Sequence, residues 1–517
     1  MGWLYAVHRT LYTVLMAHPS DDIVSAMHSL SSEDRDVIRR AYDFAEKAHG
    51  AELRKSGEPY IVHPHAIALY LADIGMDRDT VVAGILHDTT EDTDTPIEAI
   101  EEHFGKTVRF LVESVTKLSK LKYRGLERHV ESLRQLLVAT ASDIRVIIIK
   151  MADRIHNMRT IQFIEPAEKR ERIARETMEV YVPIAERLGM GNVKAELEDL
   201  AFAVLEPKRY EELTRLIEER KKELSNRIDE DIKDLKKALA ENGIRTFRTE
   251  YRVKGVHSFA RKALKKYDND ITNVFDLFAL RVILKTSEDC YRALGIIHGL
   301  WRPIPGKVKD YIAFAKPNGY RSIHTTTISR RGVTIELQIR TGAMHLDAQY
   351  GVASHYNYKE RKKEYGESTI EWIQNLLPSL KKTTNQVGIT PPQWLKDLTR
   401  AEQEHPEYEV FEDILKKDFF AERIFVFTPH GDVIDLPFEA TPVDFAYCIH
   451  SDLGDTMVGA KINGKLAAFE TKLKNGDIVE IITKEGARPN KKWLEFVKTA
   501  GAKNNIRNTL KKLNESN

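Results

Sequence analysis

Hydrophobic residues follow a helical period through the first two hundred residues. Ser31-Ser32-Glu33-Asp34 has the form of a capping box and predicts a helix that runs to Gly50. The apolar runs VVAGIL, RVIIIKMADRIHNMRT and MEVYVPIAERLGM predict further helices. The opening stretch MGWLYAVHRTLYTVLMAHPS lacks the basic start and cleavage site of a signal peptide, and it predicts a packed amphipathic helix. We expect an all-helical domain over residues 1–205.

Residues 206–243 are dense in lysine and glutamate, and they predict one long helix that Asn242-Gly243 ends. Apolar residues recur there at steps of three, four and seven: Leu213, Ile217, Leu224, Ile228, Ile232, Leu235 and Leu239. The charges indicate a solvated face, and nucleic-acid binding is the less favoured alternative. We expect a connector helix between two domains.

Beyond residue 243 the pattern becomes that of strands interleaved with helices. In GVTIELQIRT, apolar residues alternate with Thr334, Glu336, Gln338 and Arg340, so one strand face is core and the other polar. VFDLFALRVIL predicts a second strand. We expect an α+β domain over residues 244–382, in which one face of the sheet carries the functional side chains.

The last part of the chain predicts a small β-rich module. Pro391-Pro392 exclude a helix at that point, and a linker helix is expected within residues 383–421. Residues 422–485 contain two hairpin signals, at Pro429-His430-Gly431-Asp432 and at Lys474-Asn475-Gly476-Asp477. Residues 486–517 predict the start of another helical region.

Composition narrows the class of protein. The chain has 517 residues, 42% of them hydrophobic and 30% charged, which is typical of globular proteins with several domains. Its 79 basic and 78 acidic residues give no overall attraction to nucleic acid. The two cysteines, Cys290 and Cys448, predict no disulfide framework, and no apolar run is long enough to cross a membrane. We expect a cytoplasmic protein without a membrane partner.

The stretch LHDTTED places charge against an apolar helix. Asp88, Glu91 and Asp92 stand at i, i+3 and i+4, and such carboxylates beside a core call for a cation. His87 adds an imidazole, and His63 and Asp153 are plausible further ligands of manganese, iron or zinc. Such a metal activates a water molecule for attack. An ordinary surface histidine–aspartate pair is the alternative, and spacing alone leaves it open.

The α+β domain has the residues that phosphoryl transfer needs. Asp276 begins the strand DLFALRVIL and Glu336 lies on the polar face of TIELQIRT, so the two acids could share a magnesium ion. YRVKGVHSFARKAL and KVKDYIAFAKPNGYRSIHTT mix cations with tyrosines, as expected where phosphates are neutralised and a base is stacked. A solvated basic strand edge is the alternative.

RKSGEPYIVHP, GILHDTTEDT and KMADRIHNMRT, in this order, resemble the hydrolase half of the RelA/SpoT homologue (Rel) family, the bifunctional (p)ppGpp synthetases and hydrolases. The resemblance implies an HD-type domain that binds Mn²⁺ and removes the 3′-pyrophosphate of (p)ppGpp. It implies that Glu91 and Asp92 serve the attacking water and the leaving group. The implied manganese ligands are His63, His87, Asp88 and Asp153, and the implied nucleotide contacts are Arg54, Lys55, Ser56 and Asn157.

VKDYIAFAKPNGYRSIHTT and ELQIRTGAMHLDAQYGVASHYNYK resemble the synthetase half of the same family. This implies a nucleotidyltransferase-like domain that transfers pyrophosphate from ATP to the 3′-hydroxyl of GDP or GTP. Asp276 and Glu336 would be catalytic and bind Mg²⁺, with Tyr320 stacked on guanine beside Asn318. The implied contacts to the phosphates or the adenine side are Arg252, Lys254, Ser258, Lys262, Lys316 and His324.

Some positions depart from the family pattern. Lys307-Val308-Lys309-Asp310 replaces the usual Arg-x-Lys-Asp; it keeps the charge that favours the bifunctional type but loses the arginine fork. Gly255 and Gln349 also depart, and they weaken the expectation for synthetic rate more than for reaction type.

RIFVFTPHGDVIDLP and the residues after it resemble a TGS domain, which implies a small β-grasp-like fold. In this family it contacts uncharged tRNA on the ribosome, where His430 or His450 would take part. The chain stops soon afterwards, so the regulatory domains that follow in long members are missing, and the sequence does not decide between a short gene and a fragment.

Two alternatives to a balanced bifunctional enzyme remain. One is mainly a (p)ppGpp hydrolase with weak synthetase activity, which the presence of both Asp276 and Glu336 disfavours. The other is a non-enzymatic tRNA- or ribosome-binding regulator, which the intact ligand set disfavours. Because two opposed sites would waste ATP together, we hypothesise reciprocal control through the connector helix.

Overall fold

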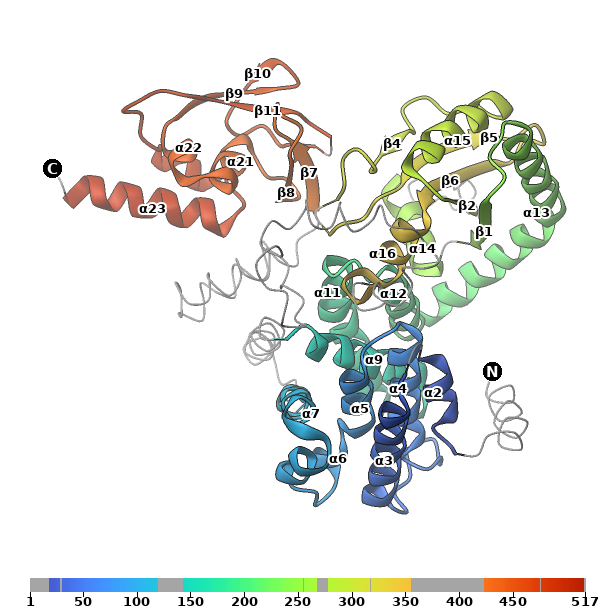
Figure 1. Ribbon diagram of the computed structural model, residues 1–517. Coiled ribbons are helices and arrows are strands. Elements are labelled where there is room, and N and C mark those ends of the chain that lie inside the picture. The colour runs from blue at the N-terminus through green and yellow to red at the C-terminus, as the bar shows by residue number, and fades with distance from the viewer. Residues whose placement is uncertain are drawn as a thin grey trace. The chain divides into compact units, whose positions relative to one another are not determined.

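The computed structural model describes residues 18–27, 30–119, 143–253, 255–266, 278–316, 318–354, 423–474 and 476–515 (Figure 1). These residues form two compact units. The first contains the described residues up to Gly306 and from Thr325 to Ser354. The second contains Lys307–His324 and the described residues from Arg423 onwards. The predicted helices within residues 1–17 and 383–421 lie outside the described residues.

The first unit begins as an all-α domain, as predicted. Its helices are α2 (Asp21–Ala26), α3 (Ser32–His49), α4 (Val62–Asp73), α5 (Arg78–Leu86), α6 (Thr89–Asp92), α7 (Ile97–Ser119), α9 (Arg145–Arg159), η1 (Ile161–Phe163), α10 (Ala167–Glu176), η2 (Thr177–Tyr181), α11 (Val182–Arg187) and α12 (Gly191–Leu205). The predicted capping box is confirmed, because Ser31 and Asp34 cap α3 reciprocally and Gly50 ends it.

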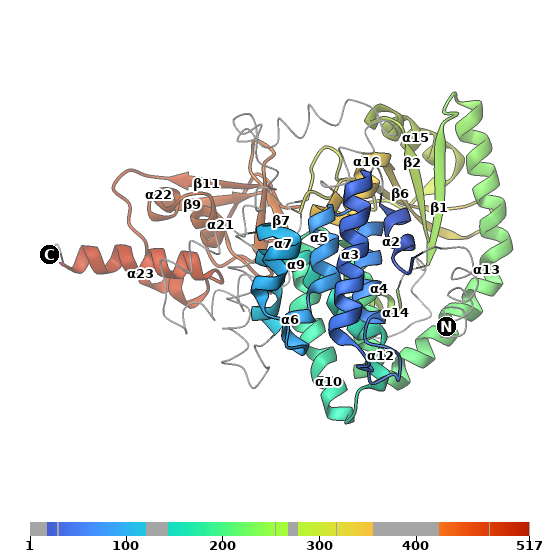
Figure 2. The ribbon, with the colours of Figure 1, turned by 60° about the horizontal axis from the view of Figure 1, so that its bottom comes forward.

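Helix α5 packs against α3, α4 and α9, and α4 also packs against α9, so distant residues come together (Figure 2). Every residue of α5 from Thr80 to Leu86 is buried, so this helix is hydrophobic on all sides and lies at the centre. Gly84 allows a close approach to α4, since a Cβ atom there would lie 2.5 Å from Cδ1 of Leu71. Residues Val146–Asp153 of α9 are buried in the same core.

The predicted long helix is confirmed as α13 (Pro207–Glu241), with Asn242 at its C-cap and a left-handed Gly243 after it. Five of the seven predicted stripe residues are buried, whereas Leu224 and Ile232 are only half-buried. The buried stripe also contains Asp231, whose exposed fraction is 0%. Asp231 accepts a hydrogen bond at 2.8 Å from Arg331, which lies in the turn between residues 328 and 334, and this explains how a carboxylate can be buried there.

The α+β part contains a mixed sheet in the order β1-β2-β6-β5-β3, with β4 paired to β5. Strands β2 and β6 run parallel and are flanked by antiparallel β1. Helices α14, α15 and α16 belong to the same region (Figure 1). The bounds are β1 (Phe247–Val253), α14 (Val256–Lys266), β2 (Phe278–Leu284), α15 (Ser287–Leu300), β3 (Arg302–Pro303), β4 (Lys309–Asp310), β5 (Ile323–Ile328), β6 (Thr334–Thr341), α16 (Gly342–Tyr350) and η4 (Gly351–Ala353).

The alternation predicted for β6 is confirmed for Ile335, Leu337 and Ile339, which are all buried. Arg340, which the alternation places on the polar face, is only 1% exposed. The polar face of this sheet is therefore covered at that end rather than solvated. A long guanidinium can be buried in this way only where polar neighbours surround it.

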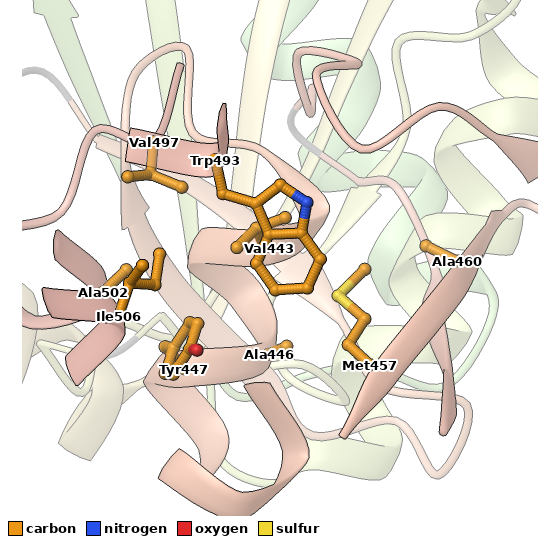
Figure 3. Close-up of a cluster of buried hydrophobic side chains, with 9 residues drawn as sticks. All are labelled: Val443, Ala446, Tyr447, Met457, Ala460, Trp493, Val497, Ala502 and Ile506. Carbon is orange, nitrogen blue, oxygen red and sulfur yellow. The ribbon is translucent and has the colours of Figure 1, made fainter. Parts of the chain in front are cut away.

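The second unit contains a small β-grasp-like fold, as predicted. Its elements are β7 (Arg423–Phe427), β8 (Val433–Pro437), α21 (Pro442–Ile449), α22 (Ser451–Asp455), β9 (Met457–Ile462), β10 (Lys465–Ala467), β11 (Val479–Thr483), η7 (Lys491–Glu495) and α23 (Ala500–Glu515). Helices α21 and α23 and strand β9 enclose one apolar core around Trp493 and Tyr447 (Figure 3).

Of the two hairpins predicted for this fold, one is confirmed and the prediction of the other is wrong. The turn before Asp432 joins antiparallel β7 and β8, as predicted. The turn from Lys474 to Asp477 joins no hairpin, because β10 and β11 both pair with β9 and not with each other. It instead leads Ile478 into a parallel bridge with Phe427, which the local turn residues do not encode.

Segment Lys307–His324, which the sequence assigns to residues 244–382, clusters with the second unit. The ring of Phe314 packs edge-on against Phe427, with centroids 5.3 Å apart. The ammonium of Lys316 lies 6.0 Å from the ring centre of Phe425. Among the described residues, no helix is both long and apolar enough to cross a membrane.

Candidate metal and nucleotide sites

Three side chains meet where α5 ends and α6 begins. His87 follows the last residue of α5, Asp88 is the N-cap of α6, and His63 lies in the first turn of α4. One ligand atom from each of the three lies within 4.8 Å of the others. Both histidines are buried, with exposed fractions of 1% and 3% for His87 and His63. The buried helix α5 therefore places the two polar residues that follow it, His87 and Asp88, next to the apolar core.

The donor atoms of this cluster fit a divalent metal. Nδ1 of His87 donates to the carbonyl oxygen of Gly84 at 2.9 Å, so Nε2 is the nitrogen that offers a lone pair when the ring is neutral. That Nε2 atom is buried and has no hydrogen-bond partner among the described residues. It lies 3.0 Å from Oδ1 of Asp88, and Nε2 of His63 lies 3.4 Å from Oδ2 of the same residue. Two imidazole nitrogens and a carboxylate suit a transition-metal ion.

Asp153, the fourth predicted ligand, comes from α9 and lies near the same nitrogen of His63 as Asp88. Its Oδ1 atom is 3.4 Å from Nε2 of His63. Lys150 donates to its Oδ2 atom at 2.7 Å, and Asn157 donates to Oδ1 at 2.5 Å. The predicted nucleotide contact Asn157 is therefore also tied to a predicted metal ligand.

The electrostatics of the cluster follow from burial and close pairing. Burial opposes charge on His87, yet the adjacent Asp88 raises the pKa of His87 to about 9. Burial acts against ionisation of Asp153 as well, but Lys150 and His63 hold its pKa far below the usual value. The carboxylates are thus ready as anionic ligands, and a metal binding to His87 must displace a proton.

Asp92 and Glu91 lie in the single turn of α6, whose amides both donate to the carbonyl oxygen of Asp88. Tyr60 connects this turn to the cluster, because its hydroxyl lies 2.6 Å from Oδ2 of Asp92 and 2.8 Å from Oδ2 of Asp88. The ring of Tyr60 stacks on His49, with centroids 4.3 Å apart. Sequence reasoning assigned no role to Tyr60, although it stands within the motif YIVHPH.

The predicted nucleotide residues Arg54, Lys55 and Ser56 lie on a tight loop that closes when the amide of Arg54 donates to the carbonyl of Glu58 at 2.8 Å. Gly57 has φ +85°, a conformation that favours glycine. Only Arg54 of the three reaches the cluster: it donates to Oδ1 of Asn157 at 3.2 Å. Lys55 is exposed, and Ser56 donates to Glu58.

His156 is the second residue near the cluster that sequence reasoning missed. Its Nδ1 atom lies 2.8 Å from Nδ1 of His63 and 2.9 Å from Nη1 of Arg54. Burial, together with His63 and Arg54, lowers the pKa of His156 to about 3, so the ring is neutral. Its position next to Asn157 in DRIHN is the only sequence signal for it.

The predicted synthetase residues of the first unit lie in two places: two are on one face of the sheet, and two are on helix α14. Arg252 of β1 pairs with Ala279 of β2, which pairs with Glu336 of β6, so Arg252 and Glu336 point to the same side of the sheet. Ser258 and Lys262 stand one turn apart on α14. Asp276 and Lys254 lie outside the described residues.

The remaining predicted nucleotide residues gather within the second unit. The hydroxyl of Tyr320 lies 2.7 Å from Nε2 of His324, and the amide of Tyr320 donates to Oδ1 of Asn318 at 3.2 Å. The ammonium of Lys316 lies 5.3 Å from the ring centre of Tyr320 and 4.9 Å from that of Tyr311. An aromatic face with a nearby cation is a suitable surface for a base and its phosphates.

Comparison with known proteins identifies three regions. Residues 41–191 match the HD domain, residues 251–363 match the region found in RelA/SpoT proteins, and residues 424–483 match the TGS domain. The HD match covers the whole histidine–aspartate cluster and implies a divalent metal there.

The relatives span most of this chain. It is 44% identical over 476 residues to the guanosine-3′,5′-bis(diphosphate) 3′-pyrophosphohydrolase of Aquifex aeolicus, covering 92% of this chain and 64% of that protein. It is 42% identical to the bifunctional (p)ppGpp synthase/hydrolase SpoT of Escherichia coli, covering 92% and 65%. Among solved structures, small alarmone synthetase 1 of Bacillus subtilis matches at 23% identity with a TM-score of 0.21, covering 31% of this chain and 92% of that chain.

The chain thus spans less than two thirds of the length of these longer relatives. The three regions nevertheless occur in the order that the sequence motifs predict, and the identity to the relatives extends over nearly the whole chain. The chain belongs to the RelA/SpoT family.

Proposed function

We propose that this protein both makes and degrades (p)ppGpp. It transfers pyrophosphate from ATP to the 3′-hydroxyl of GDP or GTP, and it hydrolyses the 3′-pyrophosphate of (p)ppGpp. The observation that carries the hydrolase half is the buried cluster of His63, His87 and Asp88, in which a histidine nitrogen without a hydrogen-bond partner faces a carboxylate. A site of this kind is costly to bury unless it binds a cation.

At the hydrolase site, Mn²⁺ held by His63, His87, Asp88 and Asp153 would supply a nucleophile from water near neutral pH. Asp92 and Glu91 lie one helical turn from Asp88, where a carboxylate can take a proton from the attacking water and a second can serve the leaving group. Arg54, near Asn157, provides the positive charge for the nucleotide phosphates.

At the synthetase site, Glu336 and Asp276 would hold Mg²⁺, with Glu336 also favouring loss of the proton from the 3′-hydroxyl. Arg252 faces the same side of the sheet as Glu336 and would neutralise phosphate charge. Tyr320 offers its ring to guanine with support from Asn318 and His324, while Lys316, Ser258, Lys262 and Lys254 would contact phosphates or adenine.

A pair of assays tests both halves. Purified protein is incubated with labelled ATP and GDP in Mg²⁺, and separately with ppGpp in Mn²⁺, and the nucleotides are separated chromatographically. Asp88→Asn should abolish hydrolysis and leave synthesis, and Glu336→Gln should do the reverse. Wild-type protein that neither makes nor degrades ppGpp contradicts the proposal, and hydrolysis by Asp88→Asn at the wild-type rate contradicts the metal assignment.

For the TGS domain we propose contact with RNA, in the form of uncharged tRNA on the ribosome. The two candidate histidines, His430 and His450, are exposed on this domain. Nδ1 of His450 accepts from the amide of Asp452 at 3.3 Å, so its Nε2 edge points outward for a partner. Filter binding of labelled tRNA to wild type and to His450→Ala tests this; equal retention of tRNA by both proteins contradicts a role for His450.

A further inference from the structure

His156 stands between a metal residue and the nucleotide loop. It lies on α9 one turn beyond Asp153, and its single Nδ1 atom contacts two different groups. One is Nδ1 of His63 at 2.8 Å, and the other is Nη1 of Arg54 at 2.9 Å. The rings of His156 and His63 have centroids 4.8 Å apart, so the contact is made edge to edge between tilted rings.

Arg54 determines the direction of these hydrogen bonds. A guanidinium has only donors, so Nδ1 of His156 must offer its lone pair to Nη1 of Arg54. Nδ1 of His63 faces the same lone pair, so it must carry the hydrogen and donate. The lone pair of His63 is then on Nε2, the nitrogen that lies 3.4 Å from both Asp88 and Asp153.

We propose that His156 is a positioning residue of the hydrolase: its Nδ1 atom holds His63 in the tautomer that can bind metal, and it holds Arg54 beside the same centre. The inference rests on the proposed hydrolase function. Metal-binding imidazoles need a partner on their second nitrogen, and losing that partner weakens metal binding by about 10–100-fold. In His87 this partner is the carbonyl oxygen of Gly84, which accepts from Nδ1. In His63, the partner of Nδ1 among the described residues is Nδ1 of His156.

Two polar substitutions of His156 test whether the acceptor at the Nδ1 position matters independently of the rest of the imidazole ring. In His156→Asn the amide oxygen takes the place of Nδ1, one bond from Cγ, so it can still accept from His63 and Arg54. In His156→Gln the oxygen lies one bond further out, in the place of Nε2. Mn²⁺ binding is measured by calorimetry without nucleotide, and KM for ppGpp is measured separately. His65→Gln, on the same helix as His63 but bonded to Asp22, is the matched control.

We expect His156→Asn to bind Mn²⁺ within about 3-fold of wild type and His156→Gln to bind about 10-fold or more weakly, with KM for ppGpp raised only in the Gln variant. Equal Mn²⁺ affinity in wild type and both variants overturns the inference while leaving the hydrolase proposal intact, as does equal weakening in both. A wild-type protein that binds no Mn²⁺ overturns the metal site and this inference together. Circular dichroism establishes that the variants are folded, and equal helix content is required for the comparison.

Discussion

The ammonium of Lys150 lies 2.7 Å from Oδ2 of Asp153, and both side chains are buried, with exposed fractions of 8% and 6%. Burial alone would neutralise either group, so each keeps its charge through the other. This pair anchors the α9 side of the proposed metal centre, because the second oxygen of Asp153 faces His63.

Lys150→Met should therefore destabilise the protein by about 3–5 kcal/mol in the absence of added metal, because it leaves the carboxylate of Asp153 buried without its cation. Added Mn²⁺ should restore part of this loss, since the ion supplies the missing charge and binds only the folded state. Urea unfolding with and without Mn²⁺ measures both effects. A loss of stability of the same size in both conditions would contradict the placement of Asp153 at the metal.

Tyr60→Phe removes one hydroxyl and keeps the ring that stacks on His49. Because this hydroxyl lies between Asp88 and Asp92, we expect kcat of ppGpp hydrolysis to fall about 10-fold or more, with a smaller change in KM. Tyr70→Phe, about two turns beyond His63 on α4, is the control and should leave kcat unchanged. A rise in KM at constant kcat would show that Tyr60 contacts substrate rather than Asp92.

His345 predicts a pH dependence of stability. Its side chain is 3% exposed, and burial together with Arg340 and Arg281 lowers the pKa of His345 to about 3. Below pH 6.5 the unfolded chain binds a proton that the folded chain rejects, so stability falls as pH falls, by at most about 1.4 kcal/mol per unit. Urea unfolding at pH 6.5 and pH 5 should show a smaller loss for His345→Gln than for wild type. The exposed His103→Gln is the control and should leave the wild-type pH dependence in place.

Adding one methyl group at Gly351 should lower the stability of the protein strongly. Its φ is +55°, and a Cβ atom there would lie 1.9 Å from the carbonyl oxygen of Leu188, so the backbone itself must move. Gly332 has φ +75° with no atom within 4 Å of its Cβ position. Gly332→Ala should cost about 1–2 kcal/mol for the left-handed backbone alone. Gly351→Ala should exceed it by about 2 kcal/mol or more, measured by urea unfolding, and equal costs would contradict the close approach.

Local patterns predicted the elements that depend on neighbouring residues in the chain. The capping box of Ser31 and Asp34, the stripe of α13 and the alternation of β6 are all confirmed, because each depends on contacts within a few residues. The hairpin assigned to Lys474–Asp477 is wrong for the opposite reason, since strand partners there are chosen by the whole fold.

The proposed site shows the same division. The ligand types in LHDTTED can be read from their spacing, and the resemblance to a family supplied their partners. The roles of Tyr60 and His156 could not be read in this way, because each acts on a residue far away in the chain: 28 positions separate Tyr60 from Asp88 and 93 separate His63 from His156.

By itself, the sequence determined the all-helical, mixed and small-sheet regions and the chemical types gathered in their motifs, because helix and strand periods are local properties of the chain. Only the tertiary structure decided which nitrogen of His63 faces Asp88, that Arg340 is buried, and that Arg54 and His63 share one acceptor on His156. These features depend on how the helices and strands pack, and packing brings together atoms that no sequence spacing relates.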